Sequence, residues 1–204
     1  MALLKHNNNS ISNVTSFPLV PSGSPTLLAT ATASSSASLS FNSTYINGDY
    51  QIYKFEFINI HPSVDGAQLW FNLSTNNGST YVVTKTSTAF YAYHTESDSV
   101  ASLSYDAPSD LAQSTGYQFL LCGNTGADAD ENANGSLTLY NPSSTTYVKH
   151  FISRINTTAS SPYSMDNYIA GYGNTTSAVN AINFKMSSGN IDAGQIKLYG
   201  LGAN

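Results

Sequence analysis

The sequence has few charged residues. Asp, Glu, Lys and Arg together make up 9% of its 204 residues, whereas soluble domains contain about 25%. The seven Lys and Arg side chains are spread along the chain, and the formal net charge is −5. A nucleic-acid-binding domain needs clustered positive charge to neutralise phosphates, so we expect no binding to DNA or RNA.

Long hydrophobic segments are also missing. No segment approaches the roughly 18 apolar residues from which a membrane-spanning helix is predicted, so we expect no membrane insertion. The first ten residues, MALLKHNNNS, contain too short an apolar segment for a secretory signal, which needs about 7–15 apolar residues. We therefore expect the chain to be made and folded in a cytoplasm.

Cysteine and catalytic motifs are scarce or missing. Cys122 is the only cysteine, which excludes an internal disulfide and a cysteine-rich metal site, and its apolar neighbours predict a buried thiol. The chain has no G-x-S-x-G nucleophile motif, no phosphate-binding loop and no dinucleotide-binding glycine pattern. The three glutamates, Glu56, Glu96 and Glu131, form no distinctive pair, although a glycosidase needs two facing carboxylates. We expect a non-enzymatic protein and name no catalytic residue.

Uncharged polar and aromatic residues take the place of charge. Hydrophobic residues make up 41% of the chain and aromatic residues 12%, which is enough to build a core. Residues 1–37 differ from the rest, because they are rich in Ser, Thr, Ala and Pro. Proline disfavours helices and central strands, and small side chains bury little surface. We predict an extended N-terminal attachment arm over residues 1–37 and one folded domain over residues 38–204.

Short alternating segments separated by turns fill the predicted domain. In residues 50–60, Tyr53, Phe55 and Phe57 fall on one face of a strand, and Lys54 and Glu56 fall on the other. The Asn76-Asn77-Gly78 turn predicts a hairpin, and a short helix is expected at residues 109–114. The other expected strands are 67–73, 81–83, 89–94, 117–122, 136–140, 147–155, 163–172, 178–186 and 195–201, the last two as a hairpin or as neighbours. This spacing predicts an all-β fold, a single jelly-roll-like β-sandwich.

Several stretches resemble a group of virion structural and tail-fibre-like proteins of marine tailed bacteriophages, of the cyanophage and pelagiphage kind. The resemblance covers residues 1–20 and 45–201 and rests on these stretches: MALLKHNNNSISNVTSFP, YKFEFINIHPSVDGAQLWFNLSTNNGSTY, AFYAYHTE, DLAQSTGYQFL, LYNPSSTTYVKHF and AGYGNTTSAVNAINFKMSSGNIDAGQIKLYGL. It implies a jelly-roll-like domain on a phage particle and assigns no catalytic residue.

From this resemblance and the composition we expect a structural protein of the virion, made in the cytoplasm of the bacterial host. It would be an exposed sandwich unit, as a capsid decoration, a head fibre or a tail fibre. Its expected partners are other virion proteins and further copies of itself. The alternative is a receptor-recognition module that binds host-surface carbohydrate.

Exposed aromatic side chains are the candidates for carbohydrate binding, because sugar rings stack on their faces. Tyr91 and Tyr93 share one face of their strand, and Trp70 lies opposite Leu69 and Phe71. The other interpretation places these aromatic residues in the core or at a subunit interface, where tyrosine is also enriched.

The acidic segment at residues 128–135 offers the best candidate for a metal site. Asp130, Asn132, Asn134 and the glycine that follows fit the first half of a calcium-binding loop, with Asp128 nearby. The position of the last ligand, normally Glu, holds Asn141. A solvated acidic turn is the alternative. We expect no cofactor, with calcium at this loop as the one exception to test.

Overall fold

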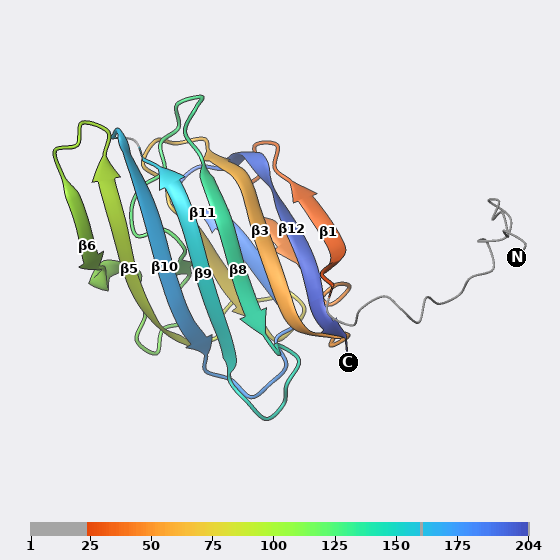
Figure 1. Ribbon diagram of the computed structural model, residues 1–204. Helices are drawn as coiled ribbons and strands as arrows, with labels where there is room; N and C mark the ends of the chain where they lie inside the picture. Colours follow the sequence, from red (N-terminus) through yellow and green to blue (C-terminus); the bar gives the residue numbers. More distant parts are fainter. Residues whose placement is uncertain (1–23, 160, 204) are drawn as a thin grey trace, which may run out of the picture.

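The computed structural model describes residues 24–159 and 161–203 (Figure 1). These residues form strands and one short 3-10 helix. The elements are β1 (Thr26–Thr32), β2 (Leu39–Phe41), β3 (Tyr50–Pro62), β4 (Leu69–Ser74), β5 (Lys85–Thr95), β6 (Ala101–Tyr105), η1 (Ala107–Ser109), β7 (Gln118–Phe119), β8 (Ala133–Tyr140), β9 (Lys149–Thr158), β10 (Tyr163–Gly173), β11 (Ala181–Met186) and β12 (Ile191–Ala203).

The strands build two antiparallel sheets. The large sheet has eight strands in the order β1-β12-β3-β8-β9-β10-β5-β6, and the small sheet has four in the order β2-β11-β4-β7. The predicted all-β sandwich is therefore confirmed. The chain passes repeatedly from one sheet to the other, and the two sheets are of unequal size.

The core lies between the two sheets and is rich in aromatic rings. Tyr53, Phe55 and Phe57 of β3 point inward and are at most 2% exposed. Phe184 of β11 faces them from the small sheet, with its ring centroid 5.3 Å from those of Phe55 and Phe57. Burying one such side chain contributes about 1.5–3 kcal/mol to folding. The alternation predicted in β3 thus sets which face of the large sheet is buried.

The last two strands lie in different sheets, so both predicted arrangements, a terminal hairpin and two neighbouring strands, are wrong. β11 lies between β2 and β4 in the small sheet, whereas β12 lies between β1 and β3 in the large sheet. Each strand sends apolar side chains into the same core from opposite sides, for example Phe184 and Leu198. Alternation alone shows the buried face of a strand and leaves its sheet undetermined.

The predicted boundary at residue 37 is also wrong. Residues 1–23 of the predicted arm lie outside the described residues. Thr26–Thr32 forms β1, which pairs with β12, and its inward Ala29 and Ala31 pack against the core. β1 is an edge strand, and its inward alanines are only partly buried.

Three local predictions differ from the structure. Residues 81–83 form no strand, although Asn77 and Gly78 do adopt the positive φ angles of the predicted turn. Only Gln118–Phe119 of the segment 117–122 is a strand. The helical turn comes earlier than predicted, at Ala107–Ser109, where Pro108 lies in its first turn and its fixed φ suits a helix start.

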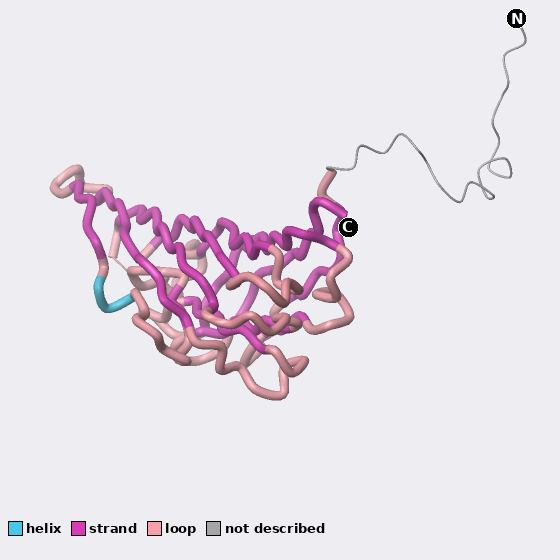
Figure 2. The backbone as a smooth tube through the Cα atoms, turned by 90° about the horizontal axis from the view of Figure 1, so that it is seen from below, coloured by secondary structure: helices cyan, strands magenta, loops and turns pink. Residues whose placement is uncertain are grey.

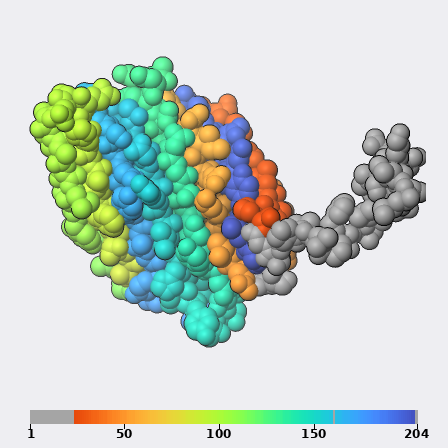
Figure 3. Space-filling model, in the orientation of Figure 1, coloured from red at the N-terminus to blue at the C-terminus, as the bar shows by residue number. Residues whose placement is uncertain are grey.

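The unequal sheets leave one face of the large sheet open. Figure 2 shows the small sheet and most of the loops on one side of the large sheet. The opposite side, seen in Figure 3, is formed by the side chains of the large sheet itself. We call it the outer face.

Candidate functional site

The outer face carries the side chains that alternate with the core residues. On β9, His150, Ile152 and Arg154 are exposed, and the intervening Phe151 and Ser153 are buried. The strand register aligns these outward residues with those of the neighbouring strands in rows that cross the sheet. The outer face is therefore a continuous surface formed by the outward residues of the eight strands.

One of these rows is aromatic. Tyr105 of β6 pairs with Phe90 of β5, Phe90 with Tyr168 of β10, and Tyr168 with Arg154 of β9. The Phe90 and Tyr168 rings stack in parallel, with centroids 4.8 Å and planes 2° apart. The guanidinium carbon of Arg154 lies 5.1 Å from the centroid of Tyr168, which adds a cation–π attraction. We call these four residues the aromatic row.

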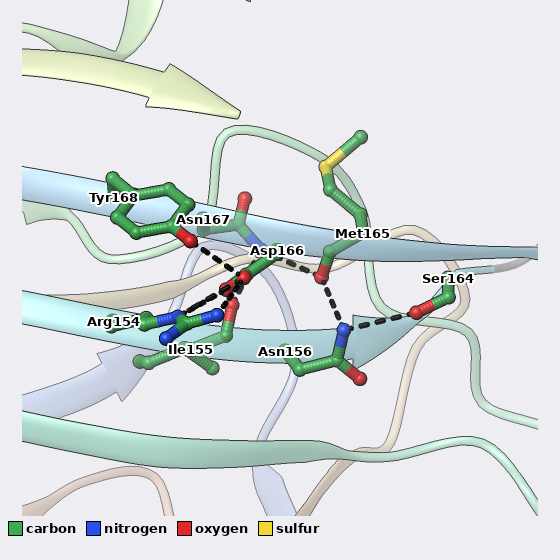
Figure 4. Close-up of polar contacts among 8 residues, drawn as sticks. All are labelled: Arg154, Ile155, Asn156, Ser164, Met165, Asp166, Asn167 and Tyr168. Carbon is green, nitrogen blue, oxygen red and sulfur yellow. Dashed lines mark hydrogen bonds and ion pairs between the residues drawn. The ribbon is translucent and has the colours of Figure 1, made fainter. Parts of the chain in front are cut away.

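Asp166 holds two side chains of the aromatic row in place, those of Arg154 and Tyr168 (Figure 4). Arg154 donates from Nε and Nη2 to the Asp166 carboxylate, with distances of 3.0 and 2.6 Å to Oδ2. The Tyr168 hydroxyl donates to the same oxygen at 2.9 Å. The two side chains are thus held on the Asp166 side of the row.

These contacts determine the ionisation of Asp166, Arg154 and Tyr168. Burial acts to raise the pKa of Asp166, but hydrogen bonds from Arg154 and Tyr168 and the charge of Arg154 outweigh it and hold the pKa below its ordinary value. The hydrogen bond to Asp166 also raises the pKa of Tyr168. At neutral pH the group therefore combines a carboxylate, a guanidinium and a neutral phenol, and its net charge is zero.

Behind the same strands, Asn167 ties β10 to β9 and to a loop. Its side chain is fully buried and donates from Nδ2 to the carbonyl of Ile155 at 3.0 Å. Its Oδ1 accepts from the backbone N–H of Cys122 at 2.7 Å. The outer Asn156 donates to Ser164 and to the carbonyl of Met165, as Figure 4 shows. These bonds connect β10 to β9 and to the loop at Cys122 beneath the aromatic row.

A shallow depression of about 440 Å³ lies next to the aromatic row. Its lining residues are Thr86, Ser87, Thr88, His150, Phe151, Ile152, Ala170, Gly171 and Tyr172. The depression lies over small residues, because Ala170 faces outward between Tyr168 and Tyr172 on β10. Gly171 allows close packing beneath it, since an added Cβ would lie 2.4 Å from the carbonyl oxygen of Thr86.

The charged residues of the outer face largely neutralise one another. Lys54 and Glu56 of β3 are 3.1 Å apart, and Lys197 is the cross-strand neighbour of Glu56. Arg154 and Asp166 form the second pair. Among the residues of the outer face that pair with a neighbouring strand, three side chains are cationic (Lys54, Lys197 and Arg154) and two are anionic (Glu56 and Asp166).

Two lysines are buried on the inner side of the same sheet. Lys85 and Lys149 are both fully buried and lie on either side of Gly173. Lys85 donates to Oδ1 of Asn72 at 2.5 Å and to the carbonyl of Val83 at 2.7 Å. Lys149 donates to the carbonyls of Tyr147 and Thr175. Burial lowers the pKa of Lys85 to about 8 and also lowers that of Lys149.

The structure does not bring together the three residues predicted to bind carbohydrate. Trp70 belongs to the small sheet, where its ring contacts Phe119 at 5.0 Å and Lys185 lies 5.7 Å from its centroid. Tyr91 and Tyr93 belong to the large sheet, and both are half-buried on the side opposite the outer face. They form a separate cluster, in which the rings of Tyr93 and Tyr163 are 5.5 Å apart.

The predicted calcium loop is held by its own hydrogen bonds. Oδ1 of Asn132 accepts from Nδ2 of Asn134 at 2.5 Å, and Oδ1 of Asn134 accepts from the backbone N–H of Asn59 at 2.8 Å. Glu131 accepts from the backbone N–H of Asp128 at 2.9 Å. The described ranges contain no group of three or more His, Cys, Asp or Glu side chains placed to hold a metal ion. Calcium binding, with Asp128 and Asp130 among the ligands, stays an untested alternative to a solvated acidic turn.

The outer-face residues were not identified as a site from the sequence. A signal was present in residues 149–158, where Ile152 occupies an outward position among His150, Arg154 and Asn156. An exposed apolar residue in a strand with an otherwise polar outer face points to a contact surface. The stacking of Phe90 on Tyr168 depends on strand order, which the sequence did not provide.

Comparisons with protein family models, with curated proteins and with solved structures found no match. Among the described residues, no helix has the length and hydropathy needed to cross a membrane.

Proposed function

We propose that this protein is a non-enzymatic structural protein of a tailed bacteriophage virion. It would be an exposed β-sandwich unit, a capsid decoration, a head fibre or a tail fibre, that is attached to neighbouring particle proteins. The observation that carries the proposal is the outer face of the large sheet, which is aromatic, low in net charge and uncovered by the described part of the chain.

The residues of this face are of the types that protein interfaces prefer. Interface cores are enriched in Tyr, Phe and Arg and depleted in Lys and Glu. The aromatic row contains two Tyr, one Phe and one Arg. Few charges have to be desolvated when such a face is covered, which limits the free-energy cost of association.

The resemblance of the sequence to marine phage virion proteins supplies the second support. A rigid sandwich repeated in many copies on a particle would bind through multivalent contacts, so weak individual contacts would be sufficient. We infer that the chain is made in the host cytoplasm and is then incorporated into the particle.

Immunogold labelling of purified particles tests this proposal. An antibody raised against residues 38–204 should label intact particles. Label over the head would assign a decoration or head-fibre role, and label on the tail would assign a tail-fibre role. Particles that contain no labelled structure, with equal antibody binding to the free protein as the control, would overturn the proposal.

A second candidate function, binding of host-surface carbohydrate, is favoured by the surroundings of Trp70. Tyr117 and Phe119 flank the Trp70 ring, and its indole Nε1 is buried with no hydrogen-bond partner. Lys185 lies over Tyr117 at 4.3 Å. Binding of the purified protein to a glycan array, lost in Trp70→Ala and retained in Tyr147→Ala at an exposed site elsewhere, would support this function. Absence of binding to any host glycan would count against it.

A further inference from the structure

We propose that the outer face binds the same face of a second copy of this chain and forms a two-fold symmetric dimer. This inference rests on the proposed structural role and specifies one of its partners. It follows from the distribution of exposed apolar side chains, from the charge of the face and from its shape.

Exposed apolar side chains concentrate on the outer face. Among the described residues, eleven large hydrophobic side chains are exposed. Six of them are outward residues of the large sheet: Leu27, Phe90, Leu103, Tyr105, Tyr140 and Ile152. Leu103 is 71% exposed and Ile152 is 54% exposed. A concentration of exposed apolar side chains on one face is typical of an interaction surface.

The charge of the face suits contact with an identical face. In a two-fold dimer each charged group faces the same kind of surface from which it comes, so unpaired like charges would repel. Here Lys54 pairs with Glu56 and Arg154 pairs with Asp166 within one chain. Lys197 lies beside Glu56 and is the one remaining cation at the paired positions of this face. A second copy would therefore meet a nearly neutral surface.

Two adjacent rows of the face differ in the size of their side chains. The aromatic row and the row Thr88–Ala170–Ile152 are adjacent outward rows of the same strands. The first consists of large side chains, and the second contains Ala170 in the lining of the depression. A two-fold axis between the rows would place the aromatic row of one copy in the depression of the other, and the reverse contact would be identical.

The face is large enough for a stable dimer. Eight strands about 4.8 Å apart span about 38 Å, and seven or eight residues at about 3.3 Å each span about 25 Å. The product is about 950 Å², and a stable interface buries about 800 Å² on each partner. The depression alone would be too small, so the contact has to extend over most of the sheet.

Sedimentation velocity of the full chain tests the dimer. We expect a dimer at about 10 μM, because interfaces of this area bind with micromolar to picomolar dissociation constants. Ile152→Glu would place an unpaired charge in the contact, and Ala170→Arg would fill the depression. Each should raise the dimer dissociation constant at least about 100-fold, since a buried unpaired charge is strongly destabilising.

Val82→Glu is the matched control. Val82 is also exposed, at 58%, but it lies in the segment between β4 and β5, outside the large sheet. This variant should dimerise like the unmodified chain. All three variants change exposed or half-buried side chains, so circular dichroism and thermal unfolding should show that each remains folded.

Three results would overturn the inference. The first is sedimentation of the chain as a monomer at this concentration. The second is a dimer whose dissociation constant is unchanged in both outer-face variants. The third is a monomeric chain that binds a glycan and loses this binding in the outer-face variants, which would assign the face to carbohydrate. A monomer found on labelled particles would leave the proposed virion role intact. A dimer missing from the particles would contradict the virion role alone.

Discussion

Lys85 is a buried cation with only neutral hydrogen-bond partners, Asn72 and Val83. Its pKa of about 8 lies below the ordinary value of 10.5 because burial disfavours the charged form. Between these two pH values the unfolded chain binds more protons at Lys85 than the folded chain does. The contribution of Lys85 to the free energy of unfolding should therefore increase as the pH rises from 8 to 10.5.

The comparison of the unmodified chain with Lys85→Met isolates this effect. Both proteins contain the same tyrosines and Lys149, so the contributions of those groups cancel in the difference. The difference in the free energy of unfolding should shift in favour of the unmodified chain by up to about 3 kcal/mol between pH 7 and pH 10.5. Urea unfolding at several pH values measures it. A difference that is constant with pH would contradict the assigned burial.

Gly171 lies where close backbone packing leaves no room for a Cβ atom. A Cβ at this position would lie 2.4 Å from the Thr86 carbonyl oxygen and 2.8 Å from the Phe151 ring. Gly171→Ala should therefore lower the free energy of unfolding by about 1–3 kcal/mol, as overpacking does.

Gly116→Ala is the control for Gly171→Ala. Gly116 is exposed, and the nearest atom to a Cβ at this position would be the Ser114 hydroxyl oxygen, 3.2 Å away. It should change the stability by less than about 0.5 kcal/mol. Equal effects of the two substitutions in thermal unfolding would show that β5 and β10 do not pack as closely as described.

At the scale of the element, the loop at residues 128–135 is either a calcium site or a solvated acidic turn. The side-chain oxygens of Asn132 and Asn134 already accept hydrogen bonds, and a cation would have to compete with them. We expect millimolar calcium to leave the melting temperature unchanged, as with added magnesium. A rise produced by calcium alone, and removed by Asp130→Ala, would instead establish the predicted calcium site, because a ligand stabilises the state that it binds.

Strands were predictable from the sequence where large apolar side chains alternate with polar ones. Alternation in residues 50–60 identified β3 and its inward face correctly, because Tyr53, Phe55 and Phe57 all enter the core. It did not identify β1, whose small residues resemble those of a linker. It also could not assign β11 and β12 to different sheets, because both contribute apolar side chains to the same core.

At the scale of the whole molecule, the unequal sheets explain why an aromatic surface stays open. A small sheet of four strands packs on one side of a large sheet of eight. The sequence predicted the sandwich, because many short alternating strands have few other solutions. It did not predict the outer face as the site, because Phe90, Tyr168 and Arg154 come from three strands whose order is set by long-range pairing.

The same architecture connects the two proposals. A rigid sandwich with one self-complementary face can form dimers, and the dimers can be repeated by the symmetry of a particle. The carbohydrate alternative depends on the other side of the molecule, around Trp70. The two functions would therefore use different surfaces and can be separated by substitution.

Quantitative mass spectrometry of gradient-purified particles tests the central claim most directly. We expect peptides from residues 24–203 to sediment with infectious particles, in a constant ratio to the major capsid protein across the gradient and after a high-salt wash. Peptides found only in the soluble fraction of the lysate, or a ratio that varies across the particle peak, would contradict the assignment of this chain to the virion.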